Sequence, residues 1–168
     1  PLLQAALGHA NARVRKTALI ALDQMEGNPL RRRDAVAFIG AADAELRQAA
    51  LWVASHHPAW SSDVLGFLDR QFRAASLSPS EMRSAREALL NYCAQEEAQE
   101  LIARLLVDEG TTEDRRLALL ETMSACSIDS FPSSWLQALR QQLMSGGGVV
   151  KTQAMSIVRS RDITALDA

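Results

Sequence analysis

The stretch Asp43-Ala44-Glu45-Leu46-Arg47-Gln48-Ala49-Ala50-Leu51 decides the fold class of this 168-residue chain. Its arginine follows an apolar residue, and a small and an apolar residue come three and four positions later. The same shape recurs along the chain, most loosely at residues 82–85, with basic residues at Arg15, Arg47, Arg83, Arg115 and Lys151. These positions are 32, 36, 32 and 36 residues apart. Near-regular spacing of one pattern predicts about five tandem repeats.

Each recurring segment is predicted to open a helix, because a turn or capping residue lies four positions before its basic residue. These residues are Asn11, Asp43, Pro79, Thr111 and Gly147. Asn, Asp and Thr side chains accept hydrogen bonds from the free N–H groups of a helix start, and Ser78-Pro79-Ser80-Glu81 has the spacing of a capping box. Further helices are expected at residues 30–39, 63–74, 96–107 and 134–144, with Gly and Pro breakers between the segments.

The predicted fold class is therefore all-α: a right-handed α-solenoid, or superhelix, of about five stacked antiparallel helix pairs. A single domain, residues 1–168, would hold the repeats at approximately 1–27, 28–57, 58–94, 95–127 and 128–160. Hydrophobic residues make up 48% of the chain and charged residues 23%, which excludes wholesale disorder. The pattern predicts two helices in every repeat, joined by short connections.

The pattern D-x-x-[VL]-R-x-x-A-L, clearest at residues 43–51, resembles the second helix of HEAT repeats. The resemblance covers nearly the whole chain, and units averaging 34 residues are similar to the shorter HEAT-like variety. Repeat three departs from it with Arg86 and Glu87 at the small-apolar pair, and repeat four with Asp114 at the apolar position. The signature patterns of tetratricopeptide and ankyrin repeats are absent. The resemblance implies an armadillo-type fold that binds other proteins.

A fainter resemblance concerns residues 52–60, Trp-Val-Ala-Ser-His-His-Pro-Ala-Trp. They are similar to a stretch in the HEAT region of large planctomycete-type bacterial proteins, which join a membrane-bound dehydrogenase domain to a c-type haem domain. The chain has no Cys-x-x-Cys-His motif for attaching haem. We therefore expect no cofactor in this chain itself.

In HEAT-like proteins the recurring basic residue pairs with an Asp or a carbonyl of the adjacent repeat. The resemblance thus implies an inter-repeat ladder, although a binding groove is the alternative role for these side chains. The candidate ladder residues are Arg15, Asp43, Arg47, Arg115 and Lys151.

One residue beyond each basic position lies a candidate partner-binding face. Its residues are Lys16, Gln48, Ser84, Arg116 and Thr152. Three of the five are neutral and the net charge of the chain is −2, so we expect no nucleic-acid binding. Two functions remain open: a protein-interaction scaffold, or a spacer that positions domains of a larger redox protein. The partner would be a protein, a peptide or another domain of the same chain.

The chain ends carry apolar helical patterns without a polar cap. We expect the sequence to be a piece of a longer protein, and we expect this piece to self-associate through its uncapped ends. The residues concerned are Leu2, Leu3, Leu7, Ile157, Ile163 and Leu166. No apolar run reaches the roughly 18 residues that span a bilayer, so membrane insertion is not expected.

The remaining chemistry-bearing residues favour structural roles. Arg31-Arg32-Arg33 is interpreted as a solvated face, with contact to an anion as the alternative. His56 and His57 are adjacent and are expected to point apart, which excludes a shared metal. Trp52 and Trp60 fit packing at a repeat junction, or else a recognition patch.

The cysteines and the catalytic motifs complete the survey. Cys93 and Cys126 are expected to be buried free thiols, with a disulfide as the alternative, which leaves the compartment open. Ser55-His56 and Ser61-Ser62-Asp63 lack a nucleophile elbow and an oxyanion signature, and Gly146-Gly147-Gly148 lacks a Gly-Lys-Ser ending. We therefore expect no enzyme activity and no metal site.

Overall fold

The computed structural model describes residues 2–27 and 29–163, and within these ranges every regular element is helical. The elements are α1 (Leu2–Ala6), α2 (Ala12–Gln24), α3 (Arg32–Val36), α4 (Ala44–Ser55), the short 3₁₀-helix η1 (Pro58–Trp60), α5 (Ser61–Arg73), α6 (Pro79–Tyr92), α7 (Glu96–Val107), α8 (Glu113–Ala125), α9 (Ser133–Ser145) and α10 (Gly148–Ser160). The prediction of an all-α chain is confirmed. None of the helices in the described part is long and apolar enough to cross a bilayer.

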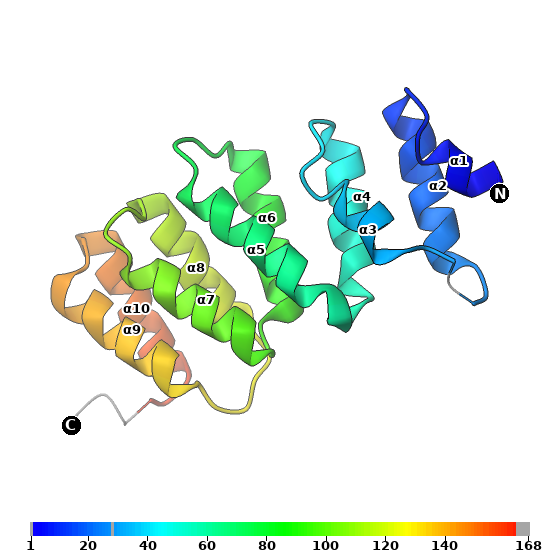
Figure 1. The fold of residues 1–168 in the computed structure, drawn as a ribbon. Helices are drawn as coiled ribbons and strands as arrows, with labels where there is room; N and C mark the ends of the chain where they lie inside the picture. The colour runs from blue at the N-terminus through cyan, green and yellow to red at the C-terminus, as the bar shows by residue number, and fades with distance from the viewer. Residues whose placement is uncertain (1, 28, 164–168) are drawn as a thin grey trace. The chain divides into compact units, whose positions relative to one another are not determined.

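The chain divides into two compact units, residues 1–67 and 68–168, and the boundary falls inside α5. In the first unit α4 packs against α2, α3 and η1, while α1 covers α2 (Figure 1). Its core is made of aliphatic side chains that α2 and α4 bury, among them Leu19, Leu22, Leu46 and Val53. Burying each such side chain contributes about 1.5–3 kcal/mol, so this face holds the unit together.

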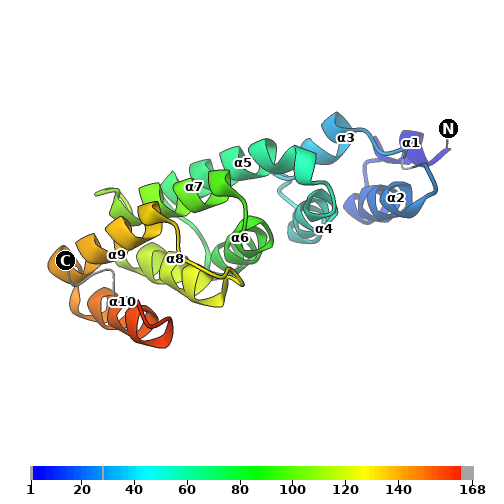
Figure 2. The ribbon, with the colours of Figure 1, turned by 90° about the horizontal axis from the view of Figure 1, so that it is seen from below.

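The second unit is built in two layers. Helices α6, α8 and α10 pack side by side in one layer, and α7 packs against α9 in the other (Figure 2). The layers meet where α7 contacts α8 and α9 contacts α10. The largest buried side chains between them include Leu89, Leu105, Leu119, Trp135 and Leu139. Helices α6, α7 and α8 thus each contact the helix two positions further along the chain, and α7 and α9 also contact the helix that follows them.

The helix starts follow from local side-chain chemistry. Asn11 Oδ1 accepts from the Arg13 amide at 2.9 Å, and Asp43 Oδ1 accepts from the Leu46 amide at 2.9 Å. The capping box before α6 is confirmed: the Ser78 hydroxyl accepts from the Glu81 amide, and the Glu81 carboxylate accepts from the Ser78 amide at 3.0 Å. These bonds satisfy N–H groups that the first helical turn leaves unpaired.

The helix predicted at residues 30–39 is much shorter than expected. Only Arg32–Val36 is α-helical, and it begins without a side-chain cap at Arg31. Beyond Val36 the bonds tighten to three-residue spacing, with the Phe38 amide on Ala35 O at 3.0 Å and the Ile39 amide on Val36 O at 3.2 Å. The α-helix therefore ends, because i→i+3 bonding replaces the i→i+4 ladder.

The predicted apolar ends are only partly exposed. Leu2 is almost fully exposed and Leu3 and Leu7 are half-buried, but Ile157 is buried inside α10. The expectation that Ile157 lies on an unprotected end face is therefore wrong, because its side chain packs into the second unit. Ile163 is half-buried, and Leu166 lies outside the described residues.

Candidate functional site

The predicted partner-binding face is not uniformly free. Gln48 and Thr152 are exposed, although the Thr152 hydroxyl donates to Gly148 O of its own helix at 2.9 Å. Ser84 is half-buried in α6. The two basic members make contacts within the fold: Lys16 Nζ lies 2.7 Å from Glu45 Oε2, and Arg116 Nη2 donates to Asp108 O at 2.9 Å. The side chains of Lys16 and Arg116 are therefore already engaged within the fold.

Among the predicted ladder residues, Arg115 makes the most extensive contact with another repeat. It starts α8, its side chain is buried, and its guanidinium donates to Phe72 O at 2.9 Å and to Ala74 O at 2.7 Å. Both carbonyls lie at the carboxyl end of α5, where helix carbonyls lack intrahelical partners. A buried cation is thereby placed at the negative end of a helix dipole.

Two hydrogen bonds of Arg47 and the capping bond of Asp43 are made to residues close by in the chain. Arg47 Nη1 donates to Ala41 O at 2.7 Å and to Ala42 O at 3.5 Å, in the turn that precedes α4. Asp43 is the amino-terminal cap of the same helix. These bonds tie α4 to its preceding turn, whereas the ladder interpretation placed the bonds of Arg47 on a neighbouring repeat.

The two outer ladder positions differ again. Arg15 of α2 places its guanidinium 5.9 Å from the centroid of the Phe38 ring, within the range of a cation–π contact with the next repeat. Lys151 is exposed at the start of α10, and the described residues offer it no polar partner. The ladder interpretation therefore does not describe Lys151.

Sequence reasoning missed three polar side chains of the second unit, each of which bonds to the helix two positions earlier in the chain or to the turn after it. From α9, Trp135 Nε1 donates to Gln99 O at 2.8 Å and Gln142 Nε2 donates to Leu106 O at 3.1 Å. Both bonds span 36 residues, which equals the longer step between the basic positions. That shared spacing is the signal that would have found them.

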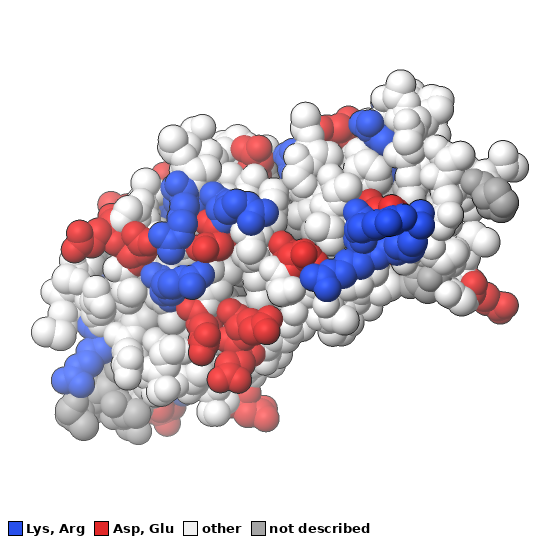
Figure 3. Space-filling model, viewed as in Figure 1, with Lys and Arg blue, Asp and Glu red and all other residues white. Residues whose placement is uncertain are grey.

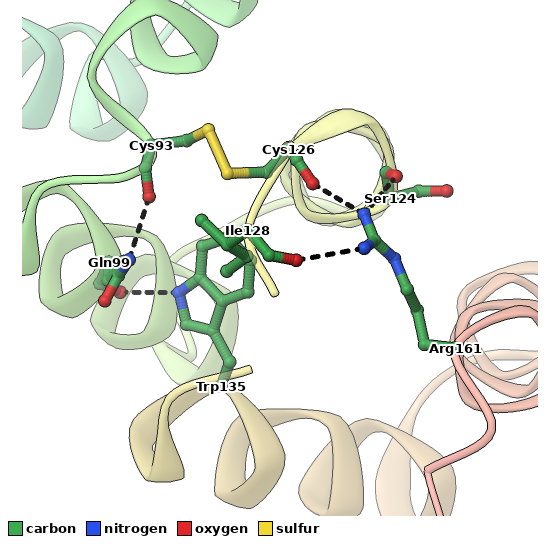
Figure 4. The surroundings of a disulfide bond; sticks show 7 residues. All are labelled: Cys93, Gln99, Ser124, Cys126, Ile128, Trp135 and Arg161. Carbon is green, nitrogen blue, oxygen red and sulfur yellow. Dashed lines mark hydrogen bonds between the residues drawn. A yellow bond between two sulfur atoms is a disulfide. The ribbon is translucent and has the colours of Figure 1, made fainter. Parts of the chain in front are cut away.

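The third is Arg161, at the end of α10. Its guanidinium donates to Cys126 O at 2.5 Å and to Ser124 O and Ile128 O at 3.2 Å each (Figure 4). It also lies 5.3 Å from the centroid of the Phe131 ring. The three carbonyls belong to the carboxyl end of α8 and the turn after it. Arg161 thus donates to carbonyls at the carboxyl end of α8, as Arg115 does at the carboxyl end of α5.

The cysteines form a disulfide, which corrects the expectation of free thiols. Cys93 and Cys126 are both buried, and their Cα atoms are 6.0 Å apart (Figure 4). Each is the carboxyl-terminal cap of its helix, α6 or α8. The sequence separation of 33 residues is close to the spacing of the repeated sequence pattern, and the bond brings the carboxyl ends of α6 and α8 together.

The two adjacent histidines converge on one carboxylate, which corrects the expectation that they point apart. His56 Nδ1 lies 3.0 Å from Asp23 Oδ2, and His57 Nε2 lies 2.7 Å from Asp23 Oδ1. His56 still has helical angles, but His57 leaves the helix with φ −119° and ψ 83°. The backbone turn therefore swings both rings toward Asp23, whose side chain is only 5% exposed.

Aromatic rings frame this histidine pair. The His57 ring stacks on Trp60 with centroids 3.8 Å apart, and His56 meets Trp52 edge to face at 4.3 Å. Trp60 is buried, whereas Trp52 is 42% exposed on α4. Packing explains Trp60, and Trp52 presents an aromatic surface to solvent. Across the described residues there is no group of three or more His, Cys, Asp or Glu side chains arranged to hold a metal ion.

The three consecutive arginines line an open hollow of about 770 Å³ in the first unit. Val36, Ala37 and Asp63 complete its lining. Basic side chains gather over α3 in the space-filling view (Figure 3). Arg32 Nε donates to Asp63 Oδ2 at 2.5 Å, and Arg31 Nε donates to Asp34 Oδ2 at 2.8 Å. The hydrogen bond and the charge of Asp63 raise the pKa of Arg32, so its guanidinium stays charged.

Comparison of the chain with protein-family models, with curated proteins and with solved structures gives no match.

Proposed function

We propose that this chain is a non-catalytic protein–protein interaction scaffold built from HEAT-like repeats. In this proposal the helices form a right-handed α-solenoid of about five antiparallel pairs, of the armadillo type. Support comes from the layered packing of α6 to α10 and from the bonds of Trp135 and Gln142, each of which reaches back 36 residues. Repeat arrays of this kind place one helix of every pair on a common surface that partners contact.

The observation that carries the binding function is the surface of α4. Gln48 and Trp52 are four residues apart and therefore lie on the same face of the helix. Gln48 is exposed, and Trp52 keeps 42% of its surface open to solvent although its neighbours in the helix are well buried. Exposed tryptophans are enriched at the centres of protein interfaces, where they supply much of the binding energy.

The experiment is site-specific photo-cross-linking in cells that make the whole protein. A photoreactive amino acid replaces Gln48 beside Trp52, and the same amino acid replaces Gln141 on α9 as a matched exposed control. A scaffold gives a discrete adduct with a separate protein at position 48 and not at 141, and Trp52→Ala removes that adduct. Adducts confined to other segments of the same chain would instead support the spacer function in a larger redox protein, and equal labelling at both positions would contradict a specific face.

A further inference from the structure

The hollow lined by Arg31, Arg32, Arg33, Val36, Ala37 and Asp63 is called the α3 hollow below. Its arginines point outward, while their acidic partners are less exposed. The side chains of Arg31, Arg32 and Arg33 are 54%, 51% and 73% exposed. Those of Asp34 and Asp63 are only 21% and 28% exposed. The carboxylates therefore hold the guanidiniums in place from below, and the surface that a partner meets is positive. Figure 3 shows this as a patch of basic side chains over α3.

Several N–H groups of these arginines make no hydrogen bond within the described residues. A guanidinium carries five N–H donors in a planar fork. Arg31 uses its Nε on Asp34, and Arg32 uses its Nε on Asp63 and one Nη on Ser62 at 3.4 Å. Arg33 lies 3.6 Å from Asp34, beyond a hydrogen bond, and its side chain makes none with the described residues. The free Nη groups of Arg31 and Arg33 are suited to bidentate contact with carboxylates.

The hollow also has an apolar floor. Val36, which is half-buried, and Ala37, which is exposed, line it together with the arginines and Asp63. An apolar side chain of a ligand can settle there while flanking carboxylates reach the guanidiniums. A nucleic-acid backbone offers no such apolar group and needs a longer run of cations, which the overall charge of −2 does not supply.

We infer that the α3 hollow binds an acidic segment of a partner protein, one in which Asp or Glu residues flank an apolar side chain. This inference rests on the proposed scaffold function and names the chemistry of its partner. The inference depends most on Arg33, because its side chain is the most exposed of the three and makes no hydrogen bond with the described residues.

The test uses the intact protein and fluorescence anisotropy at physiological salt. The probe is a fluorescein-labelled peptide rich in Glu and Leu, compared with a Lys/Leu peptide, inorganic polyphosphate and duplex DNA. We expect the Glu/Leu peptide to bind, and Arg33→Gln to weaken it about tenfold, since one charge-assisted contact is lost. Arg140→Gln, which removes another exposed arginine, this one on α9, should leave the affinity unchanged.

Each remaining outcome counts against the inference. Absence of peptide binding, equal binding of the Lys/Leu peptide, or an unchanged affinity in Arg33→Gln would overturn it. Tighter binding of polyphosphate or DNA would assign the hollow to a polyanion instead. Circular dichroism verifies that the variants fold. If the peptide does not bind but the cross-linked adduct at position 48 forms, only this inference is overturned. If the adduct at position 48 does not form, the scaffold proposal itself fails.

Discussion

Cys93 and Cys126 join the carboxyl ends of α6 and α8, so that one covalent bond connects two helices that pack side by side. Polar contacts surround it: Gln99 Nε2 donates to Cys93 O at 3.1 Å, and Arg161 donates to Cys126 O. Trp135 in turn donates to Gln99 O, which brings α9 into the same cluster (Figure 4). Helices α6 to α10 therefore meet around this bond.

Removing the disulfide should lower the free energy of unfolding by about 2–4 kcal/mol. The bond closes a loop of 33 residues, and its loss restores conformational freedom to the unfolded chain. Urea unfolding of Cys93→Ala/Cys126→Ala beside the native protein measures the difference. A reducing agent should destabilise the native protein and not the double variant. Thiols that react with maleimide in the folded, unreduced protein would contradict the disulfide.

Arg115→Ala should destabilise the second unit by about 2–3 kcal/mol. The substitution removes two charge-assisted hydrogen bonds and leaves the carbonyls of Phe72 and Ala74 without their donor. Arg47→Ala is the matched control: its bonds to Ala41 and Ala42 lie at a more exposed turn, and we expect a loss of about 1 kcal/mol. Denaturant midpoints and slopes give both values. An equal loss of unfolding free energy in the two variants would show that the burial of Arg115 does not strengthen its contribution to stability.

Alkaline pH should unfold the protein as Tyr92 ionises. Burial raises the pKa of the Tyr92 phenol from 10.0 to about 12, since the charged form is poorly solvated there. The folded state therefore keeps this proton longer than the unfolded state does, and the resulting stability is complete below pH 10 and is lost as the pH rises toward about 12. Tyr92 is the only tyrosine, so tyrosinate absorbance reports it alone.

The control for this titration is Tyr92→Phe, which keeps the ring and removes the ionising group. Its helical circular dichroism should hold to higher pH than that of the native protein. Ionisation of Tyr92 near its ordinary pKa with the helix signal intact would contradict the effect of burial.

Acid should remove the contribution of Asp108. The Gly110 amide at 2.8 Å, then the Arg73 guanidinium, hold the pKa of the Asp108 carboxyl below its ordinary value of 3.8. A depressed pKa adds stability that is present above the unfolded value and is lost as the pH falls below it. Asp108→Asn should therefore be less stable than the native protein at neutral pH, and the difference should vanish at strongly acidic pH.

Urea midpoints as a function of pH test this expectation, with the exposed Asp129→Asn as the control that changes little. A difference for Asp108→Asn that persists unchanged into acid would show that the charge of Asp108 is not its cause.

Features that depend on neighbouring residues could be predicted from the sequence. The caps at Asn11, Asp43 and Ser78 act over two or three positions, so residue type and spacing are enough to identify them. The shortened α3 shows the limit, because its apolar pattern continues to Ile39 while its hydrogen bonding changes at Val36. Propensity and periodicity do not specify which carbonyl an amide selects.

The sequence by itself determined that this chain is helical and where most helices begin, because these depend on contacts within a few residues. The spacing of the repeated pattern is a property of the residue order itself. Only the tertiary structure decided which distant groups meet: Cys93 with Cys126, Asp23 with both histidines, and Arg115 with the end of α5. These partners are 33 to 43 residues apart in the chain. Their approach depends on how whole helices pack and where each side chain then reaches, and a local residue pattern does not encode that geometry.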